Sequence, residues 1–481
     1  MSAAMIWVPA GLTGFALLAY ILPHRLLPTV VKLAMAFLLM TLVTQWMGSW
    51  QAPDALASWF FRIIAVIATT IIWYSEPYIR REAEHKHWPS ARVKAYFALL
   101  LLFVASLLAV SLWTSFLFLW VDMEFVTLSS VFLVGMEIDG RSLEAAWRFL
   151  IVTESGGLIA LLGTVIAVTA SGHSLAVWGF HPALRYPSEV HTHWALAGAY
   201  MILMGYGAKA GLAPFHTWLP DAHSEAPAPI SALLSAIKLA SAALLIYRSF
   251  EMVSSAVPAV FLHDGMIVLG LLSLVIAAGF VAFQTDLKRM WAYSSIEHIG
   301  LISLGMGFGG IALVGAMLHI WTHAAGKTLL FQNSGTIRLL YGTSDGSAGA
   351  RDILARTPWT GGLLAVGAAG IVGLPPFSPF WSEWLIVAGG FSVPQYRLFT
   401  VIAVALLVVI FIGIARRMPV WLFRPGPAER SQVVGRMAEP WGLILPSLLL
   451  AVFVLAGGIG APLVAPHLWH AVVHEAMSHS F

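Results

Sequence analysis

Lys209 lies in an apolar segment, residues 194–219, that is long enough to cross a bilayer and is interrupted by glycine and proline. An ammonium group in hydrocarbon is costly, so a lysine in this position usually has a function. Glu124 lies in a second apolar stretch, where a carboxylate is stable only when it is protonated or paired. We expect Glu124 and Lys209 to form an ion pair that closes and separates as a proton is taken up and released. A static salt bridge that fixes helix register is the alternative.

A second group of polar residues follows helical spacing. His319, His323 and Lys327 stand at positions i, i+4 and i+8, which places them on one face of a helix. Two histidines so placed could bind zinc, but the spacing indicates no third ligand, so we expect no metal. Because imidazoles change charge near neutral pH, we interpret them as proton relay groups. For His319, a buried imidazole that only hydrogen-bonds a carbonyl is an equally good interpretation.

Other ionisable residues also fall in apolar sequence or close to it. Lys238 and Glu154 are two further charges within expected membrane spans, and they could pair with one another. Asp221 and His223 lie between two spans, where a polar turn with helix-capping residues would explain them without chemistry.

The composition defines the class of protein. Of 481 residues, 59% are apolar and 10% are charged, and the mean hydropathy is +0.84. These values are typical of an integral membrane protein, here all-α. About fourteen apolar stretches reach the roughly 20 residues that a membrane helix needs. We expect them to begin near residues 4, 28, 59, 96, 117, 145, 194, 228, 263, 292, 311, 360, 398 and 441.

The chain has no cysteine. This excludes iron–sulfur clusters, cysteine-ligated haem and thiolate zinc sites. We therefore expect no cofactor in this protein, and any redox chemistry that drives it belongs to another subunit. The first twenty residues have no basic segment or small-residue cleavage pattern, so we expect them to remain as the first membrane helix.

Two of the expected spans are broken in a similar way, at Gly207-Ala-Lys-Ala-Gly-Leu-Ala-Pro-Phe215 and at Gly373-Leu-Pro-Pro-Phe-Ser-Pro-Phe380. Paired broken helices point to a transport site. Glu124 precedes Lys209 by 85 residues, and His298 precedes Glu383 by 85 residues. We infer two five-helix units of inverted topology, 96–250 and 251–420, between a three-helix segment, 1–95, and a last loop and helix, 421–481. Two unrelated proline kinks are the alternative.

The basic residues predict the orientation of the chain. Nineteen of the 26 lysines and arginines fall at the ends of odd-numbered spans, whereas only Arg62, Arg185, Arg248 and Arg397 fall on the other side. The positive-inside rule then places the odd-numbered ends in the cytoplasm and both chain termini on the outer side. The net charge of +3 reflects this topology, and nucleic-acid binding is not implied.

One long run of sequence resembles a known family. The run is Gly207-Ala-Lys-Ala-Gly-Leu-Ala-Pro-Phe-His-Thr-Trp-Leu-Pro-Asp-Ala-His-Ser-Glu-Ala-Pro-Ala-Pro-Ile-Ser-Ala232. It is similar to the signature of the antiporter-like proton-translocating subunits of respiratory complex I, group 4 membrane-bound hydrogenases and multi-subunit sodium/proton antiporters. The resemblance continues at residues 292–300, 319–335 and 373–386, and covers about residues 54–420.

The resemblance implies a fourteen-helix fold with two inverted five-helix repeats and broken helices 7 and 12. By position, Glu124 matches the glutamate of the fifth helix and Lys209 the lysine of the seventh, while His323 and Lys327 match the polar pattern of the eleventh. Glu383 matches the residue of the twelfth helix from which the proton leaves the relay. The lysine of the eighth helix usually comes about two residues later than Lys238 does here. Local unwinding of the helix could bring Lys238 to the usual position of this lysine. Alternatively, the relay could run through water and histidine.

Among the subfamilies, the most similar sequence is that of hydrogenase-4 component F. The similarity is carried by residues 120–135, 142–150 and 293–300. The resemblance implies a proton-translocating subunit of a redox-driven complex in a bacterial or archaeal cytoplasmic membrane, with other membrane and peripheral subunits as partners. The expected relay consists of Glu124, Lys209, Lys238, His298, His319, His323, Lys327 and Glu383. The alternatives are a sodium/proton antiporter subunit, a proton-driven partner of a zinc-dependent protein for inorganic-carbon uptake, and a membrane scaffold without a working channel.

Overall fold

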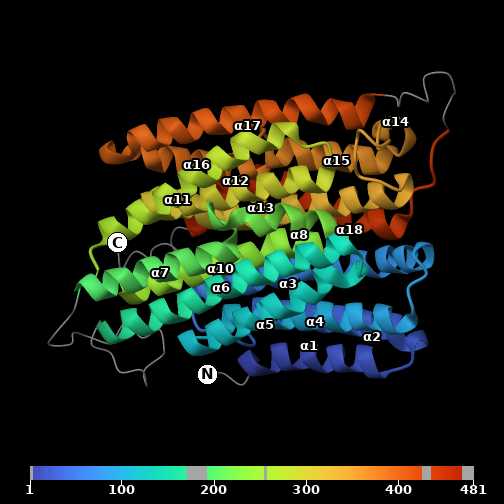
Figure 1. The fold of residues 1–481 in the computed structure, drawn as a ribbon, viewed down its shortest axis with the longest axis horizontal. Helices are drawn as coiled ribbons and strands as arrows, with labels where there is room; N and C mark the ends of the chain where they lie inside the picture. Colours follow the sequence, from blue (N-terminus) through green and yellow to red (C-terminus); the bar gives the residue numbers. More distant parts are fainter. Residues whose placement is uncertain (1–3, 171–191, 254–256, 425–434, 469–481) are drawn as a thin grey trace.

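A computed structural model describes residues 4–170, 192–253, 257–424 and 435–468. Within these ranges all regular elements are helices, and they run side by side along one common direction (Figure 1). Nine of the described helices are long and apolar enough to cross a membrane. Each start expected from the sequence lies within six residues of the first residue of a helix. The two chain ends lie outside the described residues, so their side of the membrane stays a prediction.

The first part of the chain forms six long helices. They are α1 (Ala4–Ile21), α2 (Leu27–Trp46), α3 (Ala55–His85), α4 (Ser90–Leu112), α5 (Phe116–Val134) and α6 (Gly140–Ala170). The start of α6 is a capping box, because Asp139 Oδ1 accepts from Ser142 N at 2.7 Å and Ser142 Oγ accepts from Asp139 N at 3.2 Å. These hydrogen bonds lower the pKa of Asp139, in the loop before α6, below its ordinary value.

The first broken helix starts with α7 (Thr192–Ala210) and continues through a 3-10 turn, η3 (Phe215–Trp218), into α8 (Leu219–Glu225). Gly211 ends α7 with a φ of +75°, and a Cβ at this position would collide with the side chain of Leu219. Only glycine adopts such a backbone readily, so this residue sets the break directly after Lys209. The next span is formed by α9 (Ala228–Leu233), a π-helical segment, η4 (Leu234–Lys238), and α10 (Leu239–Val253).

The second part of the chain contains α11 (Ala259–Phe280), α12 (Leu287–Phe308), α13 (Gly310–Tyr341), α14 (Ile353–Arg356), α15 (Pro358–Ile371), α16 (Ser378–Ser392), α17 (Arg397–Phe423) and α18 (Trp441–Leu468). Short 3-10 turns, η5 (Val281–Phe283) and η6 (Pro394–Tyr396), link some of these helices, as η1 (His24–Leu26) and η2 (Gly135–Glu137) do earlier in the chain. The second break separates α15 from α16 and contains Gly373, with a φ of +71°. Both expected breaks are therefore present.

The long helix α13 lies at the centre of the molecule and contacts α3, α9, α12, α15, α16 and α18 (Figure 1). Tyr74 of α3 donates to the carbonyl of Gln332 at 2.6 Å, and Ser447 of α18 donates to Gln332 Oε1 at 2.9 Å. Buried hydrogen bonds between membrane helices fix the rotation of each helix about its axis. They therefore hold the face of α13 that carries the histidines toward α12.

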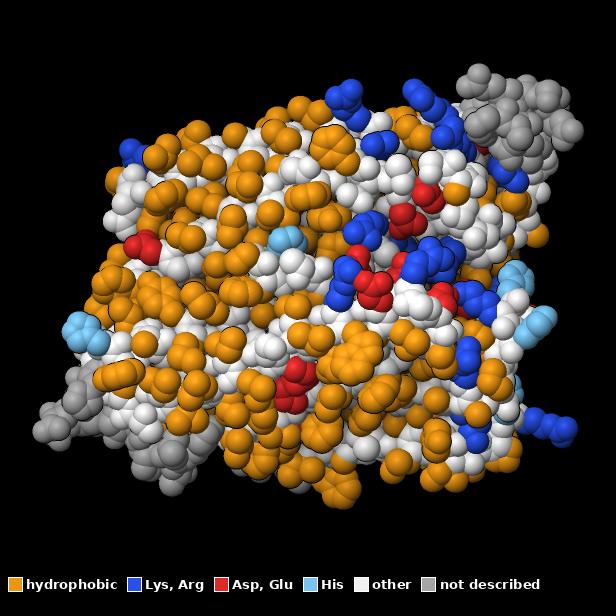
Figure 2. All heavy atoms as spheres, in the orientation of Figure 1, with side chains coloured by type: hydrophobic (Ala, Val, Ile, Leu, Met, Phe, Trp, Pro, Cys, Tyr) orange, Lys and Arg blue, Asp and Glu red, His pale blue; other side chains and the backbone are white. Residues whose placement is uncertain are grey.

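The outer surface has the character of a membrane protein. Figure 2 shows hydrophobic side chains over most of one face, with most of the lysines and arginines on this face toward the end where α14 lies. Exposed large apolar residues such as Leu162 on α6, Val268 on α11 and Leu398 on α17 belong to this surface. A soluble monomer rarely exposes so much apolar surface, so a lipid environment or other subunits must cover it.

Candidate functional site

Glu124 of α5 and Lys209 of α7 form an ion pair, as expected from the sequence. Lys209 Nζ lies 2.9 Å from Glu124 Oε2 and donates to Thr127 Oγ1 at 3.0 Å. The lysine side chain is fully buried, whereas 13% of the glutamate side chain is exposed. A charge buried in this way is stable only while its partner stays close. Separation of α5 from α7 would therefore disfavour the charged forms of both residues.

Glycine on α6 makes room for this pair. A Cβ at Gly157 would collide with Glu124 Oε1 and would lie 2.8 Å from Lys209 Cε. Trp120 of α5 donates to the carbonyl of Gly157 at 2.9 Å, which holds the two helices together beside the pair. Further along the contact between α6 and α7, Gly163 and Gly198 also face backbone atoms of the other helix. Small residues of this kind let membrane helices approach closely.

Lys238 does not pair with Glu154, and that expectation was wrong. No ion pair within 4 Å joins the two residues, although both lie in the described part of the chain. Instead Lys238 Nζ lies 4.0 Å from the ring centroid of Phe149 and 4.2 Å from that of Trp218. It has no hydrogen-bond partner. The π-helical segment that ends at Lys238 is a local unwinding of the kind considered above, and such segments are frequent at functional sites.

Three histidines from two helices form a buried cluster. His298 Nδ1 of α12 lies 2.8 Å from His319 Nε2 of α13, and His319 Nδ1 lies 2.8 Å from Ser382 Oγ of α16. His323 Nε2 lies 3.2 Å from the carbonyl of Ser235. Ring nitrogens of all three lie within 4.8 Å of one another. The structure thus supplies a third histidine, which the spacing along α13 did not indicate.

Such a cluster could hold a metal ion or pass a proton along its hydrogen bonds. The ammonium of Lys327, one turn beyond His323, interacts electrostatically with all three imidazoles. A positive charge there opposes the binding of a metal cation. Lys327 Nζ itself donates to the carbonyl of Trp291 at 2.9 Å. The same charge also opposes a proton on the imidazoles, so the charge of Lys327 alone does not distinguish a metal site from a proton relay.

Glu383 of α16 lies at the second break, where a Cβ at Gly373 would collide with its carboxylate. It is half-buried, while its neighbour Ser382 is fully buried and contacts His319.

The expected relay residues therefore form one group around Glu124 and Lys209, and another around the three histidines, with Lys238 between aromatic rings. No direct hydrogen bond joins Lys209 to Lys238 or Lys238 to His323 in the described structure.

His223 of α8 is a residue that the sequence interpretation missed. Its ring is fully buried, and neither ring nitrogen has a hydrogen-bond partner. It stacks on Phe331 of α13, with ring centroids 5.2 Å apart, and interacts electrostatically with Lys238 and Lys327. The prediction that His223 belongs to a polar turn with helix-capping residues was therefore wrong, because His223 lies within α8 and its ring caps no helix. It could not have been found from spacing alone, because the break in the chain turns α8 inward.

Asp221 of α8 fixes the position of the broken helix through two ion pairs. It forms ion pairs with Arg148 of α6 at 2.8 Å and with Arg289 of α12 at 2.9 Å. It therefore links helices from the first and second parts of the chain. Because 57% of the Arg148 side chain and 40% of the Arg289 side chain are exposed, solvent screens both ion pairs.

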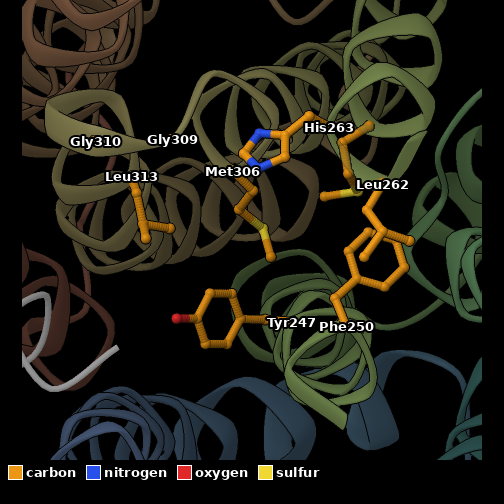
Figure 3. A pocket seen from close by; sticks show the side chains of 9 residues that line it. Tyr247, Phe250, Leu262, His263, Met306, Gly309, Gly310 and Leu313 are labelled. Atoms are coloured by element: carbon orange, nitrogen blue, oxygen red, sulfur yellow. The ribbon is translucent and has the colours of Figure 1, made fainter. Parts of the chain in front are cut away.

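A small cavity lies away from these residues, between α10, α11, α12 and α13 (Figure 3). It has a volume of about 20 Å³, enough for a single water molecule. Its labelled side chains are mostly apolar, with Tyr247 and His263 as the polar members. None of the expected relay residues lines this cavity.

The helical fold, the broken helices and the buried charges define a polytopic membrane protein of the ion-translocating class. Residues 109–423 match the family described as NADH:quinone oxidoreductase/Mrp antiporter, transmembrane, and the chain belongs to this family. The resemblance expected from the sequence is thereby confirmed.

Two curated relatives illustrate this membership. A hydrogenase-4 component F homolog from Methylacidiphilum infernorum is 34% identical over 353 residues, which cover 72% of this chain and 73% of the relative. NADH-quinone oxidoreductase subunit N from Desulforudis audaxviator is 29% identical over 87% of this chain and 84% of the relative. A chain in the structure of the membrane-bound sulfane sulfur reductase, an archaeal respiratory membrane complex, has the same fold, with a TM-score of 0.85 over 99% of this chain and 96% of that chain, at 21% identity.

Proposed function

We propose that this protein is the proton-translocating membrane subunit of a redox-driven complex related to hydrogenase-4 or complex I. The observation that carries the proposal is the buried ion pair of Lys209 and Glu124, held at 2.9 Å beside a helix break. Family membership and the names of the relatives support the same class of function.

The ion pair would act as a switch. While Lys209 is paired, the carboxylate of Glu124 offsets its charge, and a second positive charge on Lys238 is tolerated. When the pair separates, the full charge of Lys209 acts on Lys238 through a medium of low dielectric constant. Lys238 has no hydrogen-bond partner, and Glu124 and Glu154 act on it only electrostatically, so under this repulsion it would pass its proton onward.

The onward route would run through His223 and the cluster of α13 to Lys327. The unpaired nitrogens of His223 lie in the electrostatic reach of both Lys238 and Lys327, so water molecules could link the three groups. His319 and Ser382 then connect the cluster to α16, on which Glu383 would couple the relay to one side of the membrane.

The fold would supply two related halves for this path. We propose fourteen membrane crossings, with inverted five-helix units at 96–250 and 251–420, and both chain termini on the outer side of a bacterial or archaeal cytoplasmic membrane. The two breaks, one after Lys209 and one before Glu383, support the repeat. Electron transfer would take place in partner subunits, because this chain contains no cysteine for an iron–sulfur cluster.

The test is proton uptake by sealed vesicles that contain the complete native complex. We expect acidification of the lumen that requires the electron donor of the complex and does not require sodium. Sodium-dependent exchange without an electron donor would contradict the proposal and would support an antiporter. Capture of inorganic carbon driven by the membrane potential, together with a zinc protein as the only partner, would contradict it in favour of the inorganic-carbon uptake alternative.

A further inference from the structure

A buried carboxylate next to the histidine cluster has no place in the relay described so far. Glu297 of α12 directly precedes His298, and only 5% of the residue is exposed. Ser294 Oγ donates to its carboxylate at 3.2 Å, and the carboxylate lies 3.9 Å from His298 Nε2. A single hydrogen bond from a hydroxyl does not repay the burial of an ionised carboxylate. A glutamate in this position is therefore costly unless it is used.

The neighbours of Glu297 indicate what it could do. Lys327 is buried on α13, and the carboxylate with which it interacts electrostatically is that of Glu297. Glu383 on α16 also interacts electrostatically with Glu297. Among the described residues, Glu297 thus interacts electrostatically both with the lysine at the end of the cluster and with the acid at the second break, without a direct ion pair or hydrogen bond to either.

The charges of these three residues suggest a shared proton. One lysine and two carboxylates cannot all be ionised in a buried site without leaving a net negative charge. Charge balance therefore favours one proton held between the two acids while Lys327 is charged. If Lys327 gives its proton to Glu297 while the shared proton is on Glu383, all three groups become neutral. Once Lys327 has taken up a new proton and Glu383 has released its own, the proton on Glu297 can move on to Glu383.

The first half of the protein contains a matching arrangement. Glu124 on α5 is the carboxylate that faces Lys209, which lies 85 residues further on, and Glu297 precedes Glu383 by 86 residues. In the proposed repeat, α12 takes the place in the second unit that α5 takes in the first. Glu297 is then the second-unit counterpart of Glu124, a role that the sequence interpretation had given to His298.

We propose that Glu297 is a proton-carrying residue that links Lys327 to Glu383. The step transfers a proton from the ammonium of Lys327 to the carboxylate of Glu297 and, after Glu383 has released its own proton, from Glu297 to the carboxylate of Glu383. No bond other than those to the proton is formed or broken. This inference rests on the proposed function of the protein.

The experiment compares variants of the complete complex in sealed vesicles. Glu297→Gln keeps the size of the side chain and removes its ability to carry a proton, so we expect proton translocation per electron donor oxidised to fall by about tenfold or more. Glu297→Asp should recover part of the activity, because it restores a carboxylate. Glu144→Gln, which changes an exposed glutamate on α6, serves as the matched control and should translocate protons as the wild type does.

Two further measurements separate the possible outcomes. Wild type and Lys209→Ala are measured in the same vesicles, so a wild type that does not translocate protons would count against the proposed function itself. Wild-type translocation together with an undiminished Glu297→Gln variant would overturn only the role of Glu297. Infrared difference spectra recorded during turnover should contain a carboxylic acid band that Glu297→Gln removes. A band that persists unchanged in this variant would show that Glu297 only positions His298, and would also overturn the inference.

Discussion

The ammonium of Lys209 on α7 and the carboxylate of Glu124 on α5 lie 2.9 Å apart, in a space that exists because residue 157 on α6 is a glycine. The three helices define the pair together. Two of them hold the charges, and the third excludes water and lipid from one side. A small change in the packing of α6 should therefore change the pair.

Gly157→Ala tests this packing. The added Cβ would collide with Glu124 Oε1 and with the aliphatic end of Lys209, so we expect the pair to be pushed apart, proton translocation to fall, and stability to drop by about 1–3 kcal/mol. The matched control is Gly279→Ala on α11, where no atom lies within 4 Å of the new Cβ. Translocation rates and thermal unfolding in detergent provide the measurement. Equal behaviour of the two variants would contradict the proposed spacing role of Gly157.

Thr127→Val should remove one of the two hydrogen bonds that position the ammonium of Lys209. The buried hydroxyl of Thr127 accepts from Lys209 Nζ at 3.0 Å and donates to its own helix at the carbonyl of Met123. Its loss leaves the ammonium with Glu124 alone, which we expect to cost about 1–3 kcal/mol and to slow proton translocation. Thr164→Val on α6 is the control, because the buried hydroxyl of Thr164 bonds only to its own helix. If both variants translocate protons at the wild-type rate, Thr127 does not position Lys209.

Lys238→Met should separate function from stability. The ammonium of Lys238 is buried without a hydrogen bond and lies between the rings of Phe149 and Trp218. An apolar side chain of similar length removes an uncompensated polar group, so we expect the thermal stability in detergent to be equal or higher. Proton translocation should be lost, because no proton can bind there. A variant that unfolds at a lower temperature than the wild type and still translocates protons would contradict both the expected stability and the expected loss of function.

Asp139→Ala tests the capping box before α6 and its dependence on pH. Loss of the cap should cost about 1 kcal/mol at neutral pH. Because the pKa of Asp139 is lowered in the folded protein, its stabilising contribution is complete above the ordinary aspartate value and is lost as the pH falls through the lowered one. The difference in unfolding temperature between wild type and variant should therefore narrow in acid. A difference that stays constant over that range would show that the charge of Asp139 plays no part.

The positions of the helices could be predicted from the sequence because apolar stretches of membrane length leave few other arrangements. The pairing of Glu124 with Lys209 could also be predicted, since two charges in hydrocarbon need one another. His298 could not be placed beside His319 in this way, because the contact depends on how α12 packs on α13. The inward turn of His223 and the aromatic surroundings of Lys238 depend on the shape of the break after Lys209, which no spacing rule describes.

The most direct measurement is electron-donor-driven proton translocation by the complete complex that carries Lys209→Ala. Without the ammonium, Glu124 has no partner to switch with. We expect that the complex assembles with all its subunits and that proton translocation is abolished. Undiminished translocation by a correctly assembled Lys209→Ala complex would contradict the central role given to the ion pair.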